Sequence, residues 1–390
     1  MVPRIFSFRA LRYSPGSDLE LVSAPPYDVI APDERDRLDA LDPHNIVRIT
    51  LGAERPEDDE SANRYTRAAS FLREWLASGV FVVDEAPHIY LYRSDFTAEG
   101  RPRSTAGVVA ALELEELGEG GVFGHEKTRP GPKADRLALM QTTAANMEPL
   151  WFFASGAMDG FKELVEEREK VVPVADVTDP QGVRHRAWQL TEEQAAAMTT
   201  VVGDTPLVVA DGHHRYETAL TYRNERRAAD GAGPWDSTLA IISDPVQFAP
   251  ALSAIHRLVP NLSASQIPAL EPFDGSFNAL KEAVEDAGTG TIGVASPEGR
   301  FTVKTAGEVD TVWLAEEILE PNRADITYEH DPRIVEAAVG RGETAFLMAP
   351  VPVGLVAEKA LAGVRLPPKT TLFWPKPRTG LLMRDLESDR

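Results

Sequence analysis

The residues best suited to chemistry follow a short apolar run that ends in Asp-Gly. Residues 207–210 are apolar and predict a buried strand, and the apolar spacing beyond residue 215 predicts a helix. The first turn of a helix has backbone N–H groups without intrahelical acceptors and the positive end of the dipole, so anions bind there readily. An arginine in that turn adds a planar fork suited to phosphate or carboxylate. The predicted phosphate ligands are Gly212, His213, His214 and Arg215.

Two residues of this turn are also candidates for catalysis. Asp211 could orient a histidine or hold a metal ion, and His213 could take part in proton transfer. The structural alternative is an ordinary Asp-Gly turn in which Asp211 caps the helix. Three consecutive polar residues contribute little to a core, which favours the functional interpretation.

A second polar segment, residues 124–136, follows a glycine-rich run and carries seven ionisable side chains. Glu126 is the predicted general base, with His125 as its substitute in that role or as a metal ligand. The alternative is a solvated loop with charges that flank a helix. The residues expected to neutralise phosphate oxygens are Lys127, Thr128, Arg129, Lys133 and Arg136.

Two further segments are candidates. The proline pair before Tyr27 and Asp28 fixes the backbone and holds both residues rigidly, which is compatible with a structural role or with function. The candidate substrate-binding residues are Tyr27, Asp28 and Asn45. Asp28 and Asp211 are the predicted ligands of Mg²⁺. Residues 367–376 contain two lysines and two threonines, but a plain edge strand is the favoured interpretation there.

Composition restricts the class of protein. The chain has 390 residues, of which 43% are hydrophobic and 26% charged, which is typical of a globular protein with two or three domains. A net charge of −21 argues against duplex nucleic acid as a partner. The chain has no cysteine, which excludes disulfides, thiol nucleophiles and thiolate zinc sites. We expect a cytoplasmic protein without a signal peptide or membrane span. The oligomeric state is not indicated.

The positioning elements predict a mixed α/β fold. Paired strands are expected at 88–96 and 105–114, a helix at 133–146, strands at 46–51 and 150–153, and a helix that begins at Thr191 with a capping box to Gln194. We expect a main α/β domain over residues 1–259, carrying both polar segments, and a C-terminal α/β domain over 260–390. The sequence lacks a Gly-x-x-x-x-Gly-Lys-Ser/Thr phosphate loop and a Gly-x-Ser-x-Gly elbow.

Five segments together resemble the prokaryotic domain-of-unknown-function family 1015. They are APPYDVI, HNIVRI, GHEKTRPGPKADRL, VADGHHRYETAL and PKTTLFWPKPRTGL, in the expected order from about Ile5 to Leu382. Thr371 and Trp374 stand where the family is expected to have serine and tyrosine. Members often carry a SpoOJ/ParA/ParB/RepB-like label. The Asp-Gly-His-His-Arg turn is similar to the phosphate-binding turn of ParB-type domains, sulfiredoxins and free serine kinases. The resemblance implies a ParB/sulfiredoxin-like mixed-sheet core.

These observations predict a phosphotransferase. It would move a phosphoryl group from a nucleotide or pyrophosphate to a small hydroxylated metabolite such as serine. Mg²⁺ is expected from the chemistry rather than from a metal-binding motif. The alternatives are a ParB-like nucleotide-binding switch that regulates a partner, and a phosphoesterase that uses the same groups with water.

Overall fold

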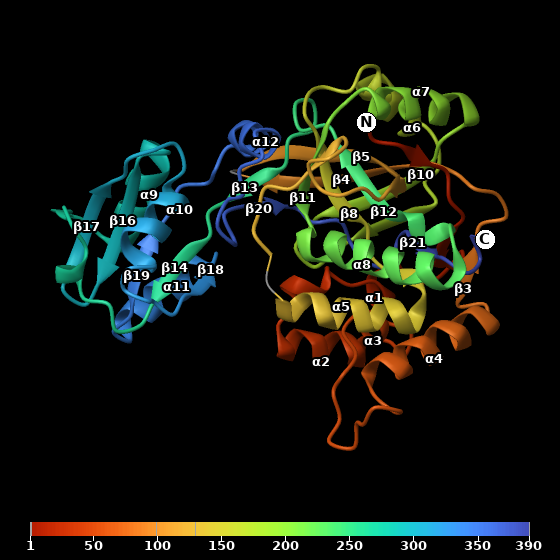
Figure 1. Ribbon diagram of the computed structural model, residues 1–390, viewed down its shortest axis with the longest axis horizontal. Coiled ribbons are helices and arrows are strands. Elements are labelled where there is room, and N and C mark those ends of the chain that lie inside the picture. The colour runs from red at the N-terminus through yellow and green to blue at the C-terminus, as the bar shows by residue number, and fades with distance from the viewer. Residues whose placement is uncertain (1, 99, 129, 390) are drawn as a thin grey trace. The chain divides into compact units, whose positions relative to one another are not determined.

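The computed structural model describes residues 2–98, 100–128 and 130–389, apart from the side chains of residues 130–132. The chain forms two compact units (Figure 1). Unit 1 comprises residues 1–124, 128–250 and 375–390, and unit 2 comprises residues 125–127 and 251–374. This division differs from the expected boundary at residue 259 in three ways. Unit 2 begins at residue 251 rather than 260 in this part of the chain. The last segment of the chain returns to unit 1, and three residues of the second polar segment belong to unit 2.

The expected mixed α/β fold is confirmed. Unit 1 is built on a nine-stranded sheet in which β11 and β12 each have one parallel neighbour and the other neighbours are antiparallel. Its order is β6-β11-β8-β12-β5-β4-β10-β9, with β1 paired to β5. The strands are β1 (Ile5–Phe6), β4 (Tyr90–Ala98), β5 (Arg101–Glu113), β6 (Val122–Phe123), β8 (Leu150–Ala154), β9 (Ala175–Thr178), β10 (Arg184–Gln189), β11 (Leu207–Asp211) and β12 (Ser237–Ser243).

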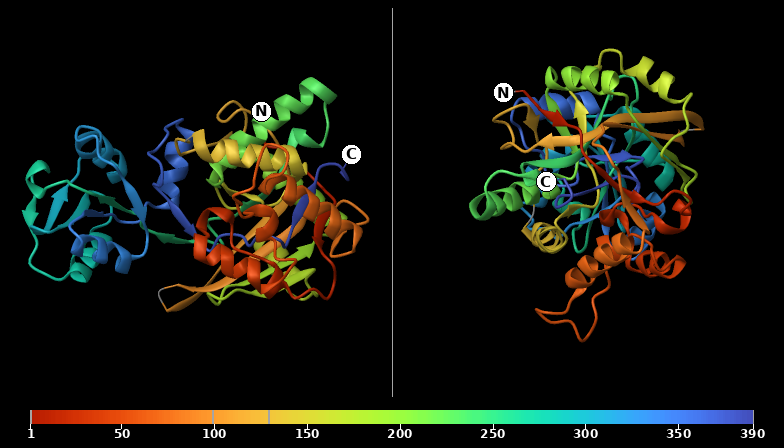
Figure 2. Two further views of the ribbon diagram at one scale, coloured as in Figure 1. Left: turned by 90° about the horizontal axis from the view of Figure 1, so that it is seen from below. Right: turned by 90° about the vertical axis from the view of Figure 1, so that its right-hand side faces the viewer.

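Helices pack around this sheet (Figures 1 and 2). Two helices, α6 (Phe161–Arg168) and α7 (Glu192–Gly203), lie on one side, and α5 (Pro130–Thr143) and α8 (His213–Asp230) pack together on the other. The predicted capping box of α7 is confirmed, because Thr191 and Gln194 exchange hydrogen bonds. The long apolar face of the sheet and these helices share one core, which holds Phe152, Trp188 and Tyr216 fully buried.

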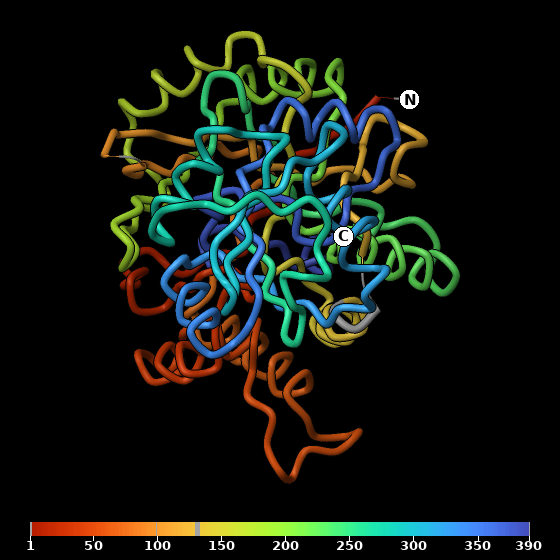
Figure 3. Tube along the Cα trace, turned by 90° about the vertical axis from the view of Figure 1, so that its left-hand side faces the viewer, coloured from red at the N-terminus to blue at the C-terminus, as the bar shows by residue number. Residues whose placement is uncertain are grey.

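A second core in unit 1 lies on the far side of α5. There, Leu139 of α5 packs with Trp75 and Phe81, whereas Met140 faces the main core. The loop of residues 52–63 extends away from this region (Figure 3). The elements here are β2 (Ala10–Tyr13), α1 (Leu19–Val22), η1 (Tyr27–Val29), α2 (Pro32–Leu41), α3 (Val47–Thr50), α4 (Arg64–Ala77), β3 (Phe81–Val83), β7 (Ala145–Asn146) and β21 (Met383–Asp385), with the sheet order β3-β2-β21-β7.

The strand predicted at 46–51 is wrong, because this segment forms α3. Asn45 is fully buried; its Oδ1 accepts the Val47 N–H at 3.0 Å, and its Nδ2 donates to the Leu21 carbonyl at 2.7 Å. These two bonds fix the backbone at the start of a helical turn despite the β-branched residues that follow. The same bonds commit the Asn45 side chain to the fold, so the structure does not support its predicted role in substrate binding.

Unit 2 is an antiparallel sheet with helices on both faces. Leu258, Leu280 and Val335 belong to the core on one face, and Val294, Leu314 and Phe346 to the core on the other. The sheet order is β15-β17-β16-β19-β14-β18, and a separate pair joins β13 to β20. The elements are β13 (Ala251–Ser253), β14 (His256–Val259), η3 (Ala264–Gln266), β15 (Glu271–Pro272), α9 (Phe277–Ala287), β16 (Thr291–Ser296), β17 (Gly299–Lys304), α10 (Asp310–Leu314) with a π-helical turn (Ala315–Leu319), β18 (Thr327–Glu329), α11 (Pro332–Gly340), β19 (Thr344–Leu347), α12 (Val353–Leu361) and β20 (Leu372–Trp374).

Candidate active site at the start of α8

The predicted strand-to-helix turn is present in unit 1. The ladder between β11 and β8 shifts register between Val209 and Asp211, and such a bulge changes the direction in which the next side chain points. Gly212 follows with a φ of 101°, in the left-handed region that glycine enters at little cost. A Cβ at this position would lie 2.9 Å from Cδ2 of Leu150. Glycine is therefore required here by both conformation and space.

The N-terminus of α8 keeps the properties that favour anions. Gly212 is the N-cap residue and supplies no side-chain cap to this 18-residue helix. The backbone N–H groups of a helix's first turn and its dipole together attract negative charge. His213 is buried and His214 is partly buried in this turn. Phosphate binding by these residues stays a prediction.

Arg215 differs from its expected role. Its Nη1 donates to Glu148 at 3.0 Å, and its Nη2 donates to Asp211 at 2.7 Å. Burial alone would lower the pKa of Arg215, but the carboxylates of Glu148 and Asp211 outweigh burial and raise that pKa. The guanidinium therefore holds two carboxylates in place, and a direct contact with phosphate would have to use its remaining N–H groups.

Lys376 completes the cluster from a distant part of the chain. Its Nζ lies 2.6 Å from an oxygen of Asp28 and 2.6 Å from the second oxygen of Asp211, and its side chain is only 10% exposed. Burial would lower the pKa of Lys376, whereas the two carboxylates raise it above its ordinary value. The edge-strand interpretation of residues 367–376 is right for β20 but missed this lysine just beyond the strand.

Glu148 joins the segments that carry these charges, and sequence reasoning missed it too. One of its oxygens accepts the backbone N–H of Tyr27 at 3.1 Å and the hydroxyl of Thr379 at 3.1 Å. A bridge between Ala24 and Thr379 runs beside it, with N–H to O distances of 3.2 and 2.9 Å. The Pro-Pro-Tyr-Asp segment and the segment after Lys376 are thereby fixed side by side.

Tyr27 lies against Arg136, whose guanidinium carbon is 3.9 Å from the centre of the tyrosine ring. Burial raises the pKa of Tyr27 to about 12, although Arg215 and Arg136 act in the opposite direction. Arg136 itself is buried and donates to the Thr50 carbonyl at 2.8 Å and to Asp135 at 2.7 Å. The hydroxyl of Tyr27 makes no hydrogen bond with any residue the structure describes, so it is available to a ligand.

The second polar segment does not form one cluster. Residues 125–127 belong to unit 2, where the N–H of Leu366 donates to the His125 carbonyl at 2.6 Å and Nε2 of His125 lies 3.1 Å from Oγ1 of Thr371. In unit 1, Thr128 donates to Glu217 at 2.8 Å, and Lys133 pairs with the same carboxylate. Arg129 lies outside the described residues. The predicted roles of Glu126 and His125 in catalysis, and of Lys127 in phosphate binding, are not tested by this placement.

Unit 2 contains a buried cation of its own, Arg257. Arg257 is 3% exposed and donates from Nη1 to the Ile255 carbonyl and from Nη2 to the Lys369 carbonyl at 2.9 Å. It makes no ion pair with the described residues, and burial lowers its pKa to about 10, with Tyr328 and Glu126 offsetting part of the shift. Lys369 has a φ of 59°, so this arginine stabilises a strained turn.

A family model described as "Protein of unknown function (DUF1015)" matches residues 5–322. The chain belongs to this family. The match covers most of the chain and confirms the family resemblance over the first four of the five segments, whereas the fifth segment, residues 368–381, lies beyond the matched range. A comparison with curated proteins finds no match.

Among solved structures, this DUF1015 chain is similar to a free serine kinase mutant in complex with ADP, at 12% identity and a TM-score of 0.40, covering 69% of this chain and 91% of that one. A conserved hypothetical protein from Pyrococcus furiosus matches at 14% identity and a TM-score of 0.39, with 69% and 94% coverage. SbnI with a C-terminal truncation, from Staphylococcus aureus, matches at 9% identity and a TM-score of 0.39, with 70% and 86% coverage. The ParB/sulfiredoxin-like core stays a prediction.

Magnesium does not fit the residues predicted to hold it. Asp28 and Asp211 share the ammonium of Lys376, which supplies the positive charge that a metal ion would bring between them. Among the described residues, no group of three His, Asp or Glu side chains is arranged to hold a metal ion. Within the same residues, no helix is long and apolar enough to cross a membrane.

Proposed function

We propose that unit 1 is a phosphotransferase that moves a phosphoryl group from a nucleotide or pyrophosphate to the hydroxyl of a small metabolite. The observation that carries the proposal is the buried ammonium of Lys376, held between Asp28 and Asp211 beside the N-terminus of α8. Phosphoryl transfer requires charge neutralisation and alignment more than covalent participation by the protein. This cluster supplies fixed charge of both signs at the point where a helix N-terminus attracts phosphate.

Lys376 is the proposed contact of the transferred group. An ammonium has three N–H donors, and two of them are used by Asp28 and Asp211. The third has no partner among the described residues and can donate to a phosphoryl oxygen. The donor's other phosphates would bind the backbone N–H groups at the start of α8. Arg215 supports this arrangement by holding Asp211 from the opposite side.

Asp28 is the proposed general base. One of its oxygens pairs with Lys376, and the other accepts no hydrogen bond from the described residues. Its side chain is 24% exposed, so an acceptor hydroxyl can reach it. In the proposed step, the hydroxyl proton moves to Asp28 and the hydroxyl oxygen forms the new O–P bond. The bridging O–P bond of the donor breaks, and the shortened donor leaves with its electron pair. Glu126, the base expected from sequence, is the competing candidate.

Phosphorus NMR on the full chain tests the proposal. ATP, ADP, CTP or pyrophosphate would each be supplied with and without a pool of small alcohols that includes serine. We expect a new phosphomonoester signal that requires both a donor and an acceptor. Orthophosphate that forms equally without an acceptor would show a phosphoesterase instead. Broadened donor signals without any product would show a nucleotide-binding switch and would contradict the proposed transfer.

A further inference from the structure

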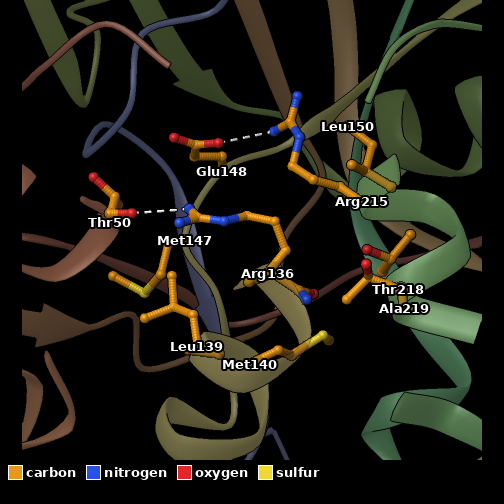
Figure 4. Close-up of a pocket in the computed structure, with 13 residues that line it drawn as sticks. Thr50, Arg136, Leu139, Met140, Met147, Glu148, Leu150, Arg215, Thr218 and Ala219 are labelled. Atoms are coloured by element: carbon orange, nitrogen blue, oxygen red, sulfur yellow. Dashed lines mark hydrogen bonds and ion pairs between the residues drawn. The ribbon is translucent and has the colours of Figure 1, made fainter. Parts of the chain in front are cut away.

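A small cavity in unit 1 lies next to the proposed active site and shares three residues with it. It has a volume of about 60 Å³ and lies between α5, α8 and the segment before β8 (Figure 4). Arg136 enters from α5, Arg215 from α8, and Glu148 from the segment between them. At about 10–15 Å³ for each water-sized group, the cavity has room for about four to six such groups. It is too small for a nucleotide base but matches part of a small metabolite.

Two buried polar groups that line this cavity lack partners. Asn146 is 8% exposed, and its Oδ1 accepts the Leu239 N–H at 3.0 Å, so its Nδ2 donors are left over. Thr238 is 3% exposed, and its hydroxyl makes no hydrogen bond. Within the described residues, neither Nδ2 nor this hydroxyl has a hydrogen-bond partner. Both side chains are mostly buried, but these two polar groups open onto the cavity, so they offer hydrogen-bonding capacity to a polar group that binds there.

The two arginines add positive charge to this set of donors. A guanidinium has five N–H groups. Arg136 uses three of them on the Thr50 carbonyl and Asp135, and Arg215 uses three on Glu148, the Pro149 carbonyl and Asp211. Each therefore keeps two N–H groups. Glu148 is the only carboxylate among the described lining residues, and Arg215, the Tyr27 N–H and Thr379 already bind its oxygens.

We propose that the cavity binds the carboxylate of the acceptor, so that the acceptor is a small hydroxy- or amino-carboxylic acid; this inference rests on the proposed phosphotransfer. A carboxylate offers acceptors only, which suits a site lined by unpaired donors and two cations. Its flat shape and the carbon beside it match the available volume. Leu139, Met140 and Leu150 line the same cavity and would contact that carbon.

Calorimetry without any phosphate donor tests the binding site by itself. The probes are glycerate, which has a carboxylate, and glycerol, which has none. We expect glycerate to bind the wild-type chain. The affinity for glycerol should be lower by about tenfold or more, because the loss of one charged hydrogen bond has an effect of this size. Equal binding of the two probes, or no binding of glycerate, would overturn the proposal.

A matched pair of variants places the effect in the cavity. Asn146→Asp keeps an oxygen for the Leu239 N–H but puts negative charge where the donors were, so glycerate affinity should fall about tenfold or more. Asn224→Asp makes the same change at an exposed position of α8 and should leave affinity unchanged. If circular dichroism shows that Asn146→Asp does not fold, Thr238→Val takes its place as the test. We expect this variant to lose glycerate affinity severalfold, a smaller effect than that of Asn146→Asp. Wild-type affinity in the folded variant would refute the site.

The acceptor test separates this inference from the proposed function. Glycerate binding without phosphoryl transfer from any donor would disprove the phosphotransferase and leave the carboxylate site in place. If transfer to glycerol were as efficient as transfer to glycerate, the phosphotransferase would stand and the carboxylate site would be disproved. The predicted result is transfer to the acid and little transfer to the uncharged alcohol.

Discussion

Lys376 in unit 1 and Arg257 in unit 2 are both buried cations, but their hydrogen-bond acceptors differ in charge. Lys376 lies between two carboxylates, which outweigh burial and raise its pKa. Arg257 has two carbonyl acceptors and a tyrosine ring, and burial lowers its pKa to about 10. We propose that the first arrangement holds charge for a ligand, whereas the second holds backbone carbonyl groups in place.

This difference separates two uses of a buried charge. The two carboxylates hold the Lys376 ammonium with two of its N–H groups and leave the third for an incoming phosphate, so the cluster suits the proposed binding and catalysis. The acceptors of Arg257 are the backbone carbonyl groups of Ile255 and Lys369, which are fixed by the fold, so this arginine supports the backbone. The four predictions that follow examine this contrast, from the largest expected effect to the smallest.

Removal of the Lys376 ammonium should reduce the free energy of unfolding more than any of the other three changes. Lys376→Met leaves Asp28 and Asp211 close together without their shared cation, so we expect a loss of about 3–5 kcal/mol in the free energy of unfolding. Urea unfolding measures this loss. Lys170→Met, at an exposed position, should change stability by less than about 0.5 kcal/mol. Equal effects of the two changes would mean that the Lys376 cluster is not electrostatically coupled.

Acid should destabilise unit 2 through His256. Burial, with Lys281 and Arg257, lowers the pKa of His256 to about 4 from an ordinary 6.5. The unfolded chain therefore binds more protons between these values, and stability falls as the pH decreases from about 6.5 to about 4, by up to about 3 kcal/mol.

The control for this prediction is a pair of histidine variants. His256→Asn retains an acceptor for the Met348 N–H but cannot take up a proton, so it should flatten this part of the pH profile. His44→Asn, on the surface of unit 1, should leave the profile as it is. A wild-type pH profile in His256→Asn would contradict the prediction.

The turn before α8 should resist a methyl group. Gly212→Ala puts a Cβ 2.9 Å from Leu150, whereas Gly182→Ala meets no atom within 4 Å at a φ of 81°. Both changes carry the cost of a left-handed alanine, and Gly212→Ala should lose about 1–3 kcal/mol more through the contact. Thermal unfolding of both variants isolates that difference. Equal losses would show that the turn has free space.

Arg257→Met should be the mildest of the four. It removes two hydrogen bonds to carbonyls but leaves no buried anion behind, so we expect a loss of about 1–2 kcal/mol. A loss as large as that of Lys376→Met, measured in the same urea titration, would mean that Arg257 balances a negative charge and would remove the contrast between the two regions.

The turn before α8 could be predicted from sequence because its signals are local. An apolar run, Asp211-Gly212 and the helical spacing that follows lie within one stretch of chain. Glu148 and Lys376 could not be found in this way. They reach the turn through the bridge between Ala24 and Thr379, which joins segments far apart in the sequence. Sequence spacing contains no information on such pairing.

Two differences between the sequence predictions and the structure have the same cause. The segment after Asn45 has a strand-like composition, but the buried Asn45 amide accepts the Val47 N–H at the start of a helix and is held in place by its bond to the Leu21 carbonyl. Residues 125–127 are continuous with the rest of the second polar segment, yet they pair with Leu366 in unit 2. In both places a tertiary hydrogen bond overrides the local pattern, and only the fold reveals it.

The most direct test of the central claim is the rate of phosphoryl transfer in Asp28→Asn, with Glu126→Gln and the exposed Asp36→Asn beside it. The proposed base in unit 1 predicts that Asp28→Asn slows transfer by about 100-fold or more while donor binding is retained. Glu126→Gln and Asp36→Asn should retain most of the wild-type rate. Wild-type transfer in Asp28→Asn, or a collapse confined to Glu126→Gln, would contradict the claim and move the base to unit 2.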